Sequence, residues 1–325
     1  MVYRDGWKVY AVNGARVDPV AVLPPEQITF DLIEANKPFR KILVERYGKA
    51  RYRVEAAEHR RAKPAPVLQK QLPTDPTERL EFLRDAASGK LPFYERYQGG
   101  DRVNVWNELV GLGDRVRLAA HAADGLAVAY ATMDRAAHNV SLLVERLNRL
   151  HYEFASAAWE KPSSESRKEW RDVDHRIGLV PFSLRAWWDV VGSVDLTGDD
   201  DLLSNRGGMT SPNLGTLLTD PLVIDGPAVT ISENEMFEGE PDYEPECVLA
   251  PDRYHKHEIS GGQPYSIGLP CPAADAVLLY EENELYLVDY LRRCFRYGGF
   301  PGFFDDESRI PEREMAMLTG GLLEI

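Results

Sequence analysis

The chain has 325 residues, of which 44% are hydrophobic and 28% are charged, and its formal net charge is -14 at pH 7. This length exceeds that of one ordinary domain, so we expect two domains with enough apolar residues for a core in each. No segment has the composition of a secretory signal peptide and no apolar run is long enough to cross a bilayer, so we expect a cytoplasmic protein without membrane contact.

The charge is unevenly distributed along the chain. Residues 1–125 carry a net charge of +4, whereas residues 126–325 carry -18. An acidic surface repels phosphate backbones and attracts basic proteins. We therefore expect a protein partner with a basic surface and no direct binding of nucleic acid.

The first third of the chain is predicted to contain a hairpin followed by helices. Asn13-Gly14 lies between two β-prone runs, which is typical of a hairpin turn, and two short helices are expected over 24–35 and 38–48. Thr74-Asp75-Pro76 predicts the start of a further helix, which we expect to end at Gly89. Residues 12–52 also resemble a segment of bacterial proteins of unknown function, which implies no activity.

The middle of the chain is predicted to contain strands and one long helix. Val103–Trp106 and Val116–Ala120 have the composition of strands, and residues 126–150 have apolar side chains at helical spacing. The sequence AAWEKPSSES that follows is typical of a linker. We therefore place a domain boundary near residue 155, with domains over 1–155 and 156–325.

A helix pair rich in tryptophan opens the second domain. The first helix carries Trp170 and Ile177 on one side and ends at Gly178. Ser183 is expected to cap the second helix, which ends at Gly192 and leads into a strand over 193–196. Trp187 and Trp188 are adjacent and so point about 100° apart, which means that both can be buried only if the helix is covered on a wide arc. A core role for both is one interpretation, and one buried with one partly exposed tryptophan is the other.

This order of an Ile-Gly helix end, a link with proline, an aromatic helix ending at glycine and an outgoing strand resembles the SUKH superfamily of bacterial immunity and cell-wall-assembly-regulator-like proteins. In that family the second helix usually ends in Asn-Gly, whereas Val191 precedes Gly192 here. The segment LYLVDYLRRCFRYGGFPGFF also resembles the closing helix of bacterial proteins with such domains. The resemblance implies a non-enzymatic immunity protein that neutralises a toxin by covering its working surface.

The rest of the second domain is predicted to be a sheet covered by helices. Short apolar runs separated by Pro, Gly and Asp predict strands of one sheet at 221–224, 247–250, 265–269 and 276–280. A helix is expected over 285–297. Helices before and after a group of strands favour the α+β class, here with a mixed hairpin-plus-helices region before the SUKH-like domain.

Acidic segments next to aromatic residues are the predicted partner-binding site. Carboxylates supply electrostatic steering and aromatic side chains supply contact energy, although a solvated acidic loop is the alternative interpretation. The predicted partner-binding residues are Trp187, Trp188, Asp199, Asp200, Asp201, Glu233, Glu235, Phe237, Glu238, Glu240, Asp242, Tyr243, Glu244 and Glu246.

No other motif predicts an active site. His255 and His257 would project to the same side of an extended segment, which makes them weak candidates for metal ligands, but two histidines do not define a site. Phosphate-loop, nucleophile-elbow and His-Glu-x-x-His motifs are absent. No cofactor and no catalytic residue is therefore predicted.

Together these features predict a non-enzymatic protein-binding module, with an immunity protein against a basic toxin such as a nuclease as the leading hypothesis. A metal-dependent enzyme centred on His255 and His257 is the alternative from a different class. A regulatory adaptor, in which each half binds its own partner, is the third hypothesis.

Overall fold

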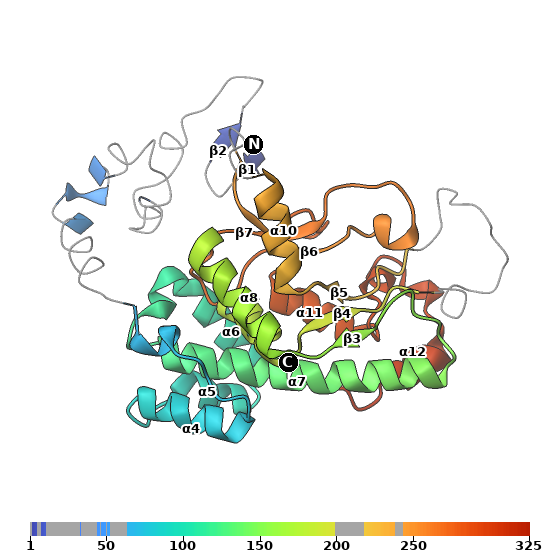
Figure 1. Ribbon diagram of the computed structural model, residues 1–325, viewed down its shortest axis with the longest axis horizontal. Coiled ribbons are helices and arrows are strands. Elements are labelled where there is room, and N and C mark those ends of the chain that lie inside the picture. Colours follow the sequence, from blue (N-terminus) through green and yellow to red (C-terminus); the bar gives the residue numbers. More distant parts are fainter. Residues whose placement is uncertain are drawn as a thin grey trace. The chain divides into compact units, whose positions relative to one another are not determined.

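A computed structural model describes residues 2–4, 8–10, 33, 44–45, 47–49, 51–52, 64–198, 218–237 and 243–325 (Figure 1). Its contacts divide the chain into two compact units, residues 1–64 and residues 65–325. In the first unit, β1 (Val2–Arg4) pairs antiparallel with β2 (Lys8–Tyr10). The hairpin predicted at Asn13-Gly14 lies outside the described residues, as do most residues of the two helices predicted after it.

The second unit begins with a short 3-10 turn, η4 (Pro66–Gln69), and three helices, α4 (Pro76–Ala86), α5 (Pro92–Gln98) and α6 (Arg102–Gly111). The predicted start of α4 is confirmed, because the Asp75 carboxylate accepts hydrogen bonds from the N–H groups of Thr77 and Glu78, and Pro76 needs no such acceptor.

The predicted strand over 103–106 is wrong, because these residues belong to α6. Val105, Trp106 and Leu109 form its buried face, while Val103 is 55% exposed. A run of four residues is too short to show this helical spacing. The strand predicted over 116–120 is also wrong. That segment leaves the 3-10 turn η5 (Gly113–Arg117) and enters the next helix.

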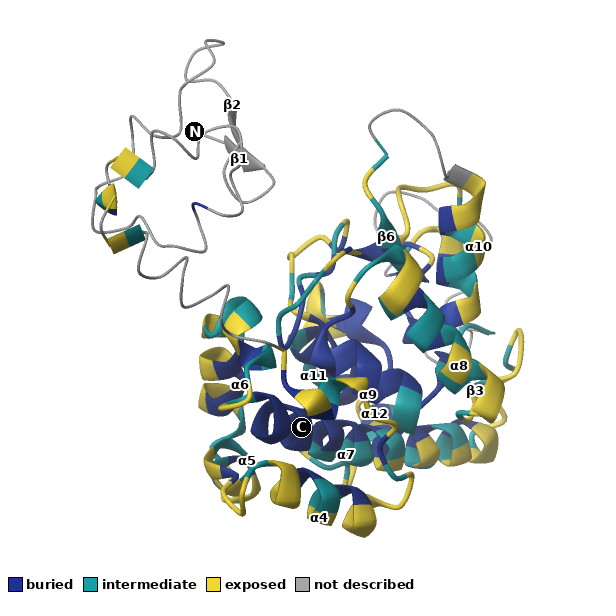
Figure 2. Cartoon of the chain, turned by 60° about the vertical axis from the view of Figure 1, so that its left-hand side comes forward, coloured by how far each residue is buried: buried dark blue, intermediate teal, exposed yellow. Residues whose placement is uncertain are grey.

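Helix α7 (Ala122–Arg149) is the longest described helix and forms the base of the core. It packs against α4, α5, α9 and α12. Its predicted apolar face is confirmed, because Met133, Val140 and Leu147 are fully buried. Figure 2 shows the buried residues gathered between α7 and the helices above it.

The predicted helix pair is present as α8 (Ser164–Asp172), a π turn η6 (Val173–Ile177) and α9 (Phe182–Val190). Ser163 and Ser166 form a capping box at the start of α8. The predicted capping role of Ser183 is wrong. The residue lies inside α9 and its hydroxyl donates to Asp275 at 2.7 Å, because Pro181 already stands at the N-cap position.

The described strands of the second unit form two small antiparallel sheets instead of the one sheet that we predicted. The first has the order β3 (Trp159–Glu160), β4 (Ser193–Asp195) and β5 (Val223–Ile224), and the second pairs β6 (Glu246–Ala250) with β7 (Tyr265–Gly268). The run 276–280 makes only isolated bridges. The α+β class is nevertheless confirmed.

Three further helices complete the unit: α10 (Pro227–Phe237), α11 (Leu287–Arg296) and α12 (Glu312–Thr319). The 3-10 turns between and after them are η8 (His255–His257), η9 (Pro301–Phe304) and η10 (Glu307–Arg309). The residues of α11 that we expected to point inward, Leu287, Leu291, Cys294 and Phe295, are all buried.

The boundary expected near residue 155 lies inside the second unit, and α7 and α9, which stand on opposite sides of it, pack together closely. Among the described residues, no helix has both the length and the apolar composition needed to cross a membrane.

Candidate functional site

A cavity of about 520 Å³ lies between the start of α8, the first sheet and the start of α10. Its wall is strongly acidic. Among the residues that the structure describes, five carboxylates line it and only one basic side chain, that of Lys161, does so. The carboxylates are Glu160, Glu165, Glu169, Asp195 and Asp225. We call this feature the acidic cavity.

The backbone around the acidic cavity is determined by a glycine and a capping box. Gly192 has a φ of +92°, and a Cβ there would lie 2.2 Å from the carbonyl oxygen of Glu160, so only glycine lets β3 approach β4 this closely. The Ser163–Ser166 capping box places the N-terminus of α8 at the same wall. Glu165 lies in the first turn, where the helix dipole favours a negative charge.

The apolar part of the wall comes from Val194, Pro227 and Trp188. Trp188 is 0% exposed, and its Nε1 donates to the main-chain oxygen of Asp225 at 3.0 Å. Trp187 is also 0% exposed, so both tryptophans are core residues and the interpretation in which one of them is partly exposed is wrong. Residues Phe182–Trp188 of α9 are all buried, so neither tryptophan offers an exposed contact surface.

Two aspartates of the acidic cavity differ in their surroundings. Asp195 accepts hydrogen bonds from Ser156 Oγ at 2.6 Å and from the N–H and hydroxyl groups of Thr197 at 2.9 and 2.6 Å. Among the described residues, no donor forms a hydrogen bond with the Asp225 carboxylate, and only burial and the charges of Asp195 and Lys256 act on it. Burial and, to a smaller extent, the charge of Asp195 raise the pKa of Asp225 to about 6, while the charge of Lys256 acts in the opposite direction. Asp225 would therefore gain most from a cation in the cavity.

The predicted acids of α10 and the following strand lie at the other end of α10. Burial raises the pKa of Tyr243, and the charges of Glu246 and Glu233 raise it as well. The Tyr243 hydroxyl donates to Asn234 Oδ1 at 2.7 Å. Glu246 accepts from Ser266 and Tyr280, so it is partly engaged inside the protein.

The exposed part of this end of α10 consists of Glu235, Met236 and Glu244. Glu235 forms an ion pair of 3.3 Å with Arg176, and both side chains are exposed. Met236 is 70% exposed and was not singled out by the sequence, because a lone methionine in a charged segment has no distinctive spacing. Asp199, Asp200, Asp201, Glu238, Glu240, Asp242 and the side chain of Phe237 lie outside the described residues.

The two candidate metal ligands do not lie on an extended segment, as we had expected, but in the 3-10 turn η8. The His255 ring contacts the Asp252 carboxylate, while His257 Nε2 accepts the N–H of Asp220 at 3.3 Å. The residue between them points inward, because Lys256 Nζ forms a fully buried ion pair of 2.7 Å with Asp220. Within the part of the chain that the structure describes, no three His, Cys, Asp or Glu side chains are grouped to hold a metal ion.

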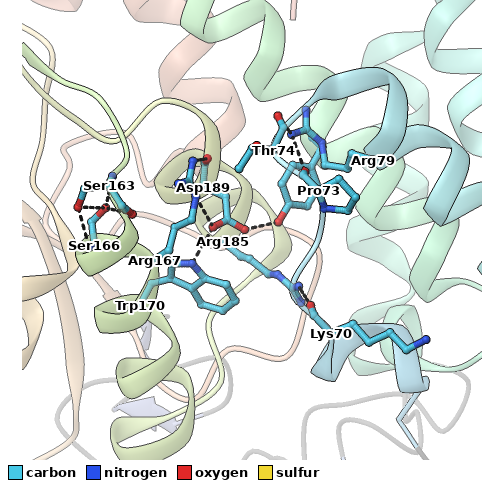
Figure 3. A network of polar contacts seen from close by, with 11 residues as sticks. Lys70, Pro73, Thr74, Arg79, Ser163, Ser166, Arg167, Trp170, Arg185 and Asp189 are labelled. Carbon is cyan, nitrogen blue, oxygen red and sulfur yellow. Dashed lines mark hydrogen bonds and ion pairs between the residues drawn. The ribbon is translucent and has the colours of Figure 1, made fainter.

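A polar network behind the acidic cavity was missed by the sequence interpretation (Figure 3). Asp189 of α9 accepts hydrogen bonds from Trp170 Nε1 of α8 at 2.8 Å and from the Tyr130 hydroxyl of α7. Arg167 of α8 lies 3.8 Å from the same carboxylate, and Arg185 stacks on the Trp170 ring at 5.0 Å. The network fixes α8, and with it the wall that carries Glu165 and Glu169. Its members are far apart in sequence, so no local motif could have revealed it.

Comparisons with protein-family models, with curated proteins and with solved structures found no match to this chain.

Proposed function

We propose that this chain is a non-enzymatic protein-binding module whose acidic cavity receives basic side chains of a protein partner. The observation that carries the proposal is the composition of the cavity wall, with five carboxylates and one lysine around about 520 Å³. A cavity with walls of one charge sign focuses the field and selects oppositely charged groups.

The chemistry of the wall favours a long cationic side chain. Lysine and arginine have an apolar stem and a charged end, which match the apolar surface of Val194 and Pro227 and the carboxylates beside them. Asp225 supports the same proposal, because a guanidinium or ammonium group would give its carboxylate a partner in a partly desolvated position.

The SUKH resemblance in the sequence connects this binding mode with toxin neutralisation. A basic toxin such as a nuclease must bind phosphate with a cationic surface, and an acidic protein that covers this surface competes with the nucleic acid. We therefore propose an immunity function, with the exposed acids and Met236 at the end of α10 as additional contacts.

The test removes three charges from the acidic cavity. The variant Glu160→Gln, Glu165→Gln, Glu169→Gln and the unmodified protein serve as bait for proteins of the source cell, which are identified by mass spectrometry. We expect the unmodified protein to retain a basic protein that the variant retains about tenfold less, with a weaker dependence of the association rate on salt.

A control variant removes the same number of negative charges as the cavity variant, but away from the cavity. It replaces the exposed residues Glu81, Glu145 and Glu312 with Gln. It should retain the partner as the unmodified protein does. Equal losses in the two variants would reduce the effect to net charge, and unchanged binding in the cavity variant would contradict the proposal.

A further inference from the structure

Residues Leu323–Ile325 lie in a groove formed by side chains of three helices. Asn139 of α7 is 0% exposed, and its side chain accepts the N–H of Leu323 at 2.7 Å and donates to the carbonyl oxygen of Leu323 at 2.8 Å. These two hydrogen bonds bind the N–H and the C=O of one residue, as a neighbouring β-strand would. The groove therefore recognises backbone instead of one particular side chain at this position.

Arginine side chains bind the main chain of the next two residues, Glu324 and Ile325. Arg135 Nε donates to the carbonyl oxygen of Glu324, and Arg292 Nε donates to that of Ile325 at 2.9 Å. Arg102 contacts the Glu324 carboxylate at 3.2 Å, although this carboxylate is 86% exposed. The Ile325 side chain is only 4% exposed and belongs to the apolar core cluster. One apolar anchor thus accompanies four main-chain hydrogen bonds of this segment.

The groove carries three arginines, of which Arg102 pairs with Glu324 of the occupant and Arg292 pairs with Asp289 at 2.7 Å. The Arg102 guanidinium also lies 5.6 Å from the centre of the Tyr97 ring. Two arginine nitrogens, Arg102 Nε and Arg292 Nη2, are buried and have no hydrogen-bond partner in the part of the chain that the structure describes. These spare donors favour a segment with acceptor oxygens.

The connection to the rest of the chain allows the segment to leave. Helix α12 ends at Thr319, and the next residues are Gly320 and Gly321, of which Gly321 has a φ of +73° and no atom within 4 Å of a Cβ placed there. The last buried contact before this point is Leu318, whose carbonyl oxygen accepts from Arg146 at 2.7 Å. Release of residues 322–325 would leave α12 in place.

We propose that this groove is a binding site for an extended peptide segment with an acidic residue followed by a branched apolar residue, and that Leu323–Ile325 fill it as a displaceable intramolecular ligand. The site is independent of the acidic cavity, from which it differs in charge and in residues. The ligand class follows from the main-chain contacts, the three arginines and the pocket for Ile325.

The test uses the full chain with a loosened occupant. Leu323→Pro removes the N–H that Asn139 accepts, and Ile325→Ser removes the apolar anchor, while the groove itself is unchanged. The probe is a fluorescent heptapeptide, Thr-Gly-Gly-Leu-Leu-Glu-Ile, with both ends blocked. Fluorescence anisotropy should show at least about tenfold tighter binding to the double variant than to the unmodified chain, because a tethered occupant competes at high effective concentration.

Two controls distinguish the groove from nonspecific adsorption. A peptide with Pro at the second Leu position should not bind, and the further change Arg135→Ala in the double variant should weaken binding of the original peptide. Hydrogen exchange at residues 322–325 reports whether the occupant has been released. A released groove that binds no peptide, a segment that stays protected in the double variant, or equal binding by the unmodified chain would each overturn the proposal.

Discussion

At the scale of single residues, the buried carboxyl group of Asp275 has the largest expected influence on the dependence of stability on pH. It is 3% exposed and accepts hydrogen bonds from Ser183 Oγ and from the N–H groups of Ala276 and Val288. Burial raises its pKa to about 7 against the opposing effect of these donors. Because this value exceeds the ordinary 3.8, the folded state binds the proton more tightly than the unfolded state does.

This stabilisation is fully present below about pH 4 and is lost as the pH rises through 7. We expect Asp275→Asn to flatten the dependence of the free energy of unfolding on pH over this range, an effect of up to about 4 kcal/mol. Urea denaturation at a series of pH values measures it. The exposed Asp85 of α4 provides the matched Asn control, which should keep the original slope. The same slope in both variants would show that Asp275 does not titrate as its burial implies.

The two tryptophans show what a sequence can and cannot predict about individual residues. Their adjacency fixes the angle between them on a helix, but whether both are buried depends on how many elements cover α9. The inward-facing residues of α11 were predictable, because one partner surface covers one helical face. The Asp225 carboxyl was not predictable as a site residue, because its neighbours Asp195 and Trp188 reach it only through the fold.

At the scale of elements, the Asp189 network determines the position of α8. Asp189 joins α9 to Tyr130 of α7 and to Trp170 of α8 (Figure 3). Removal of one member of a buried network leaves the others without partners, which usually costs more than the bond itself contributes. We expect Asp189→Asn to lower the free energy of unfolding by about 2–4 kcal/mol, measured by chemical denaturation.

The control for this prediction is Asp172→Asn on α8. Asp172 forms an exposed i,i+4 pair of 3.9 Å with Lys168, and such pairs contribute less than about 1 kcal/mol. If the two variants lost equal stability, the network would have no special role in holding α8.

Among the elements, the sequence predicted those with long periodic patterns and missed those with short ones. Helices α7, α8, α9 and α11 were all expected, since their apolar residues recur over two turns or more. Helix α6 was mistaken for a strand over four residues, and the run 276–280 was expected to join a sheet that it meets only through isolated bridges. Strand pairing depends on distant partners, so a short apolar run cannot decide it.

At the scale of the whole molecule, the acidic cavity and the proposed peptide groove around Leu323–Ile325 both lie within the unit 65–325 and differ in charge. This arrangement suits the adaptor hypothesis as well as the immunity hypothesis, because the two sites would select different partners. The groove could not be derived from the charge of each half of the sequence, since its arginines come from α6, α7 and α11.

The extent of the smallest stable fragment follows from the packing of α9. Its residues Phe182–Trp188 are all buried, and α7 provides one of the surfaces that cover them. We expect a fragment of residues 65–325 to unfold cooperatively, whereas a fragment of residues 156–325 lacks α7 and exposes the apolar side chains of α9 to water. Size-exclusion chromatography and thermal unfolding followed by circular dichroism measure both fragments. The shorter fragment should aggregate or unfold without a cooperative transition, and a monomeric, cooperative 156–325 would instead support an independent domain that begins near residue 155.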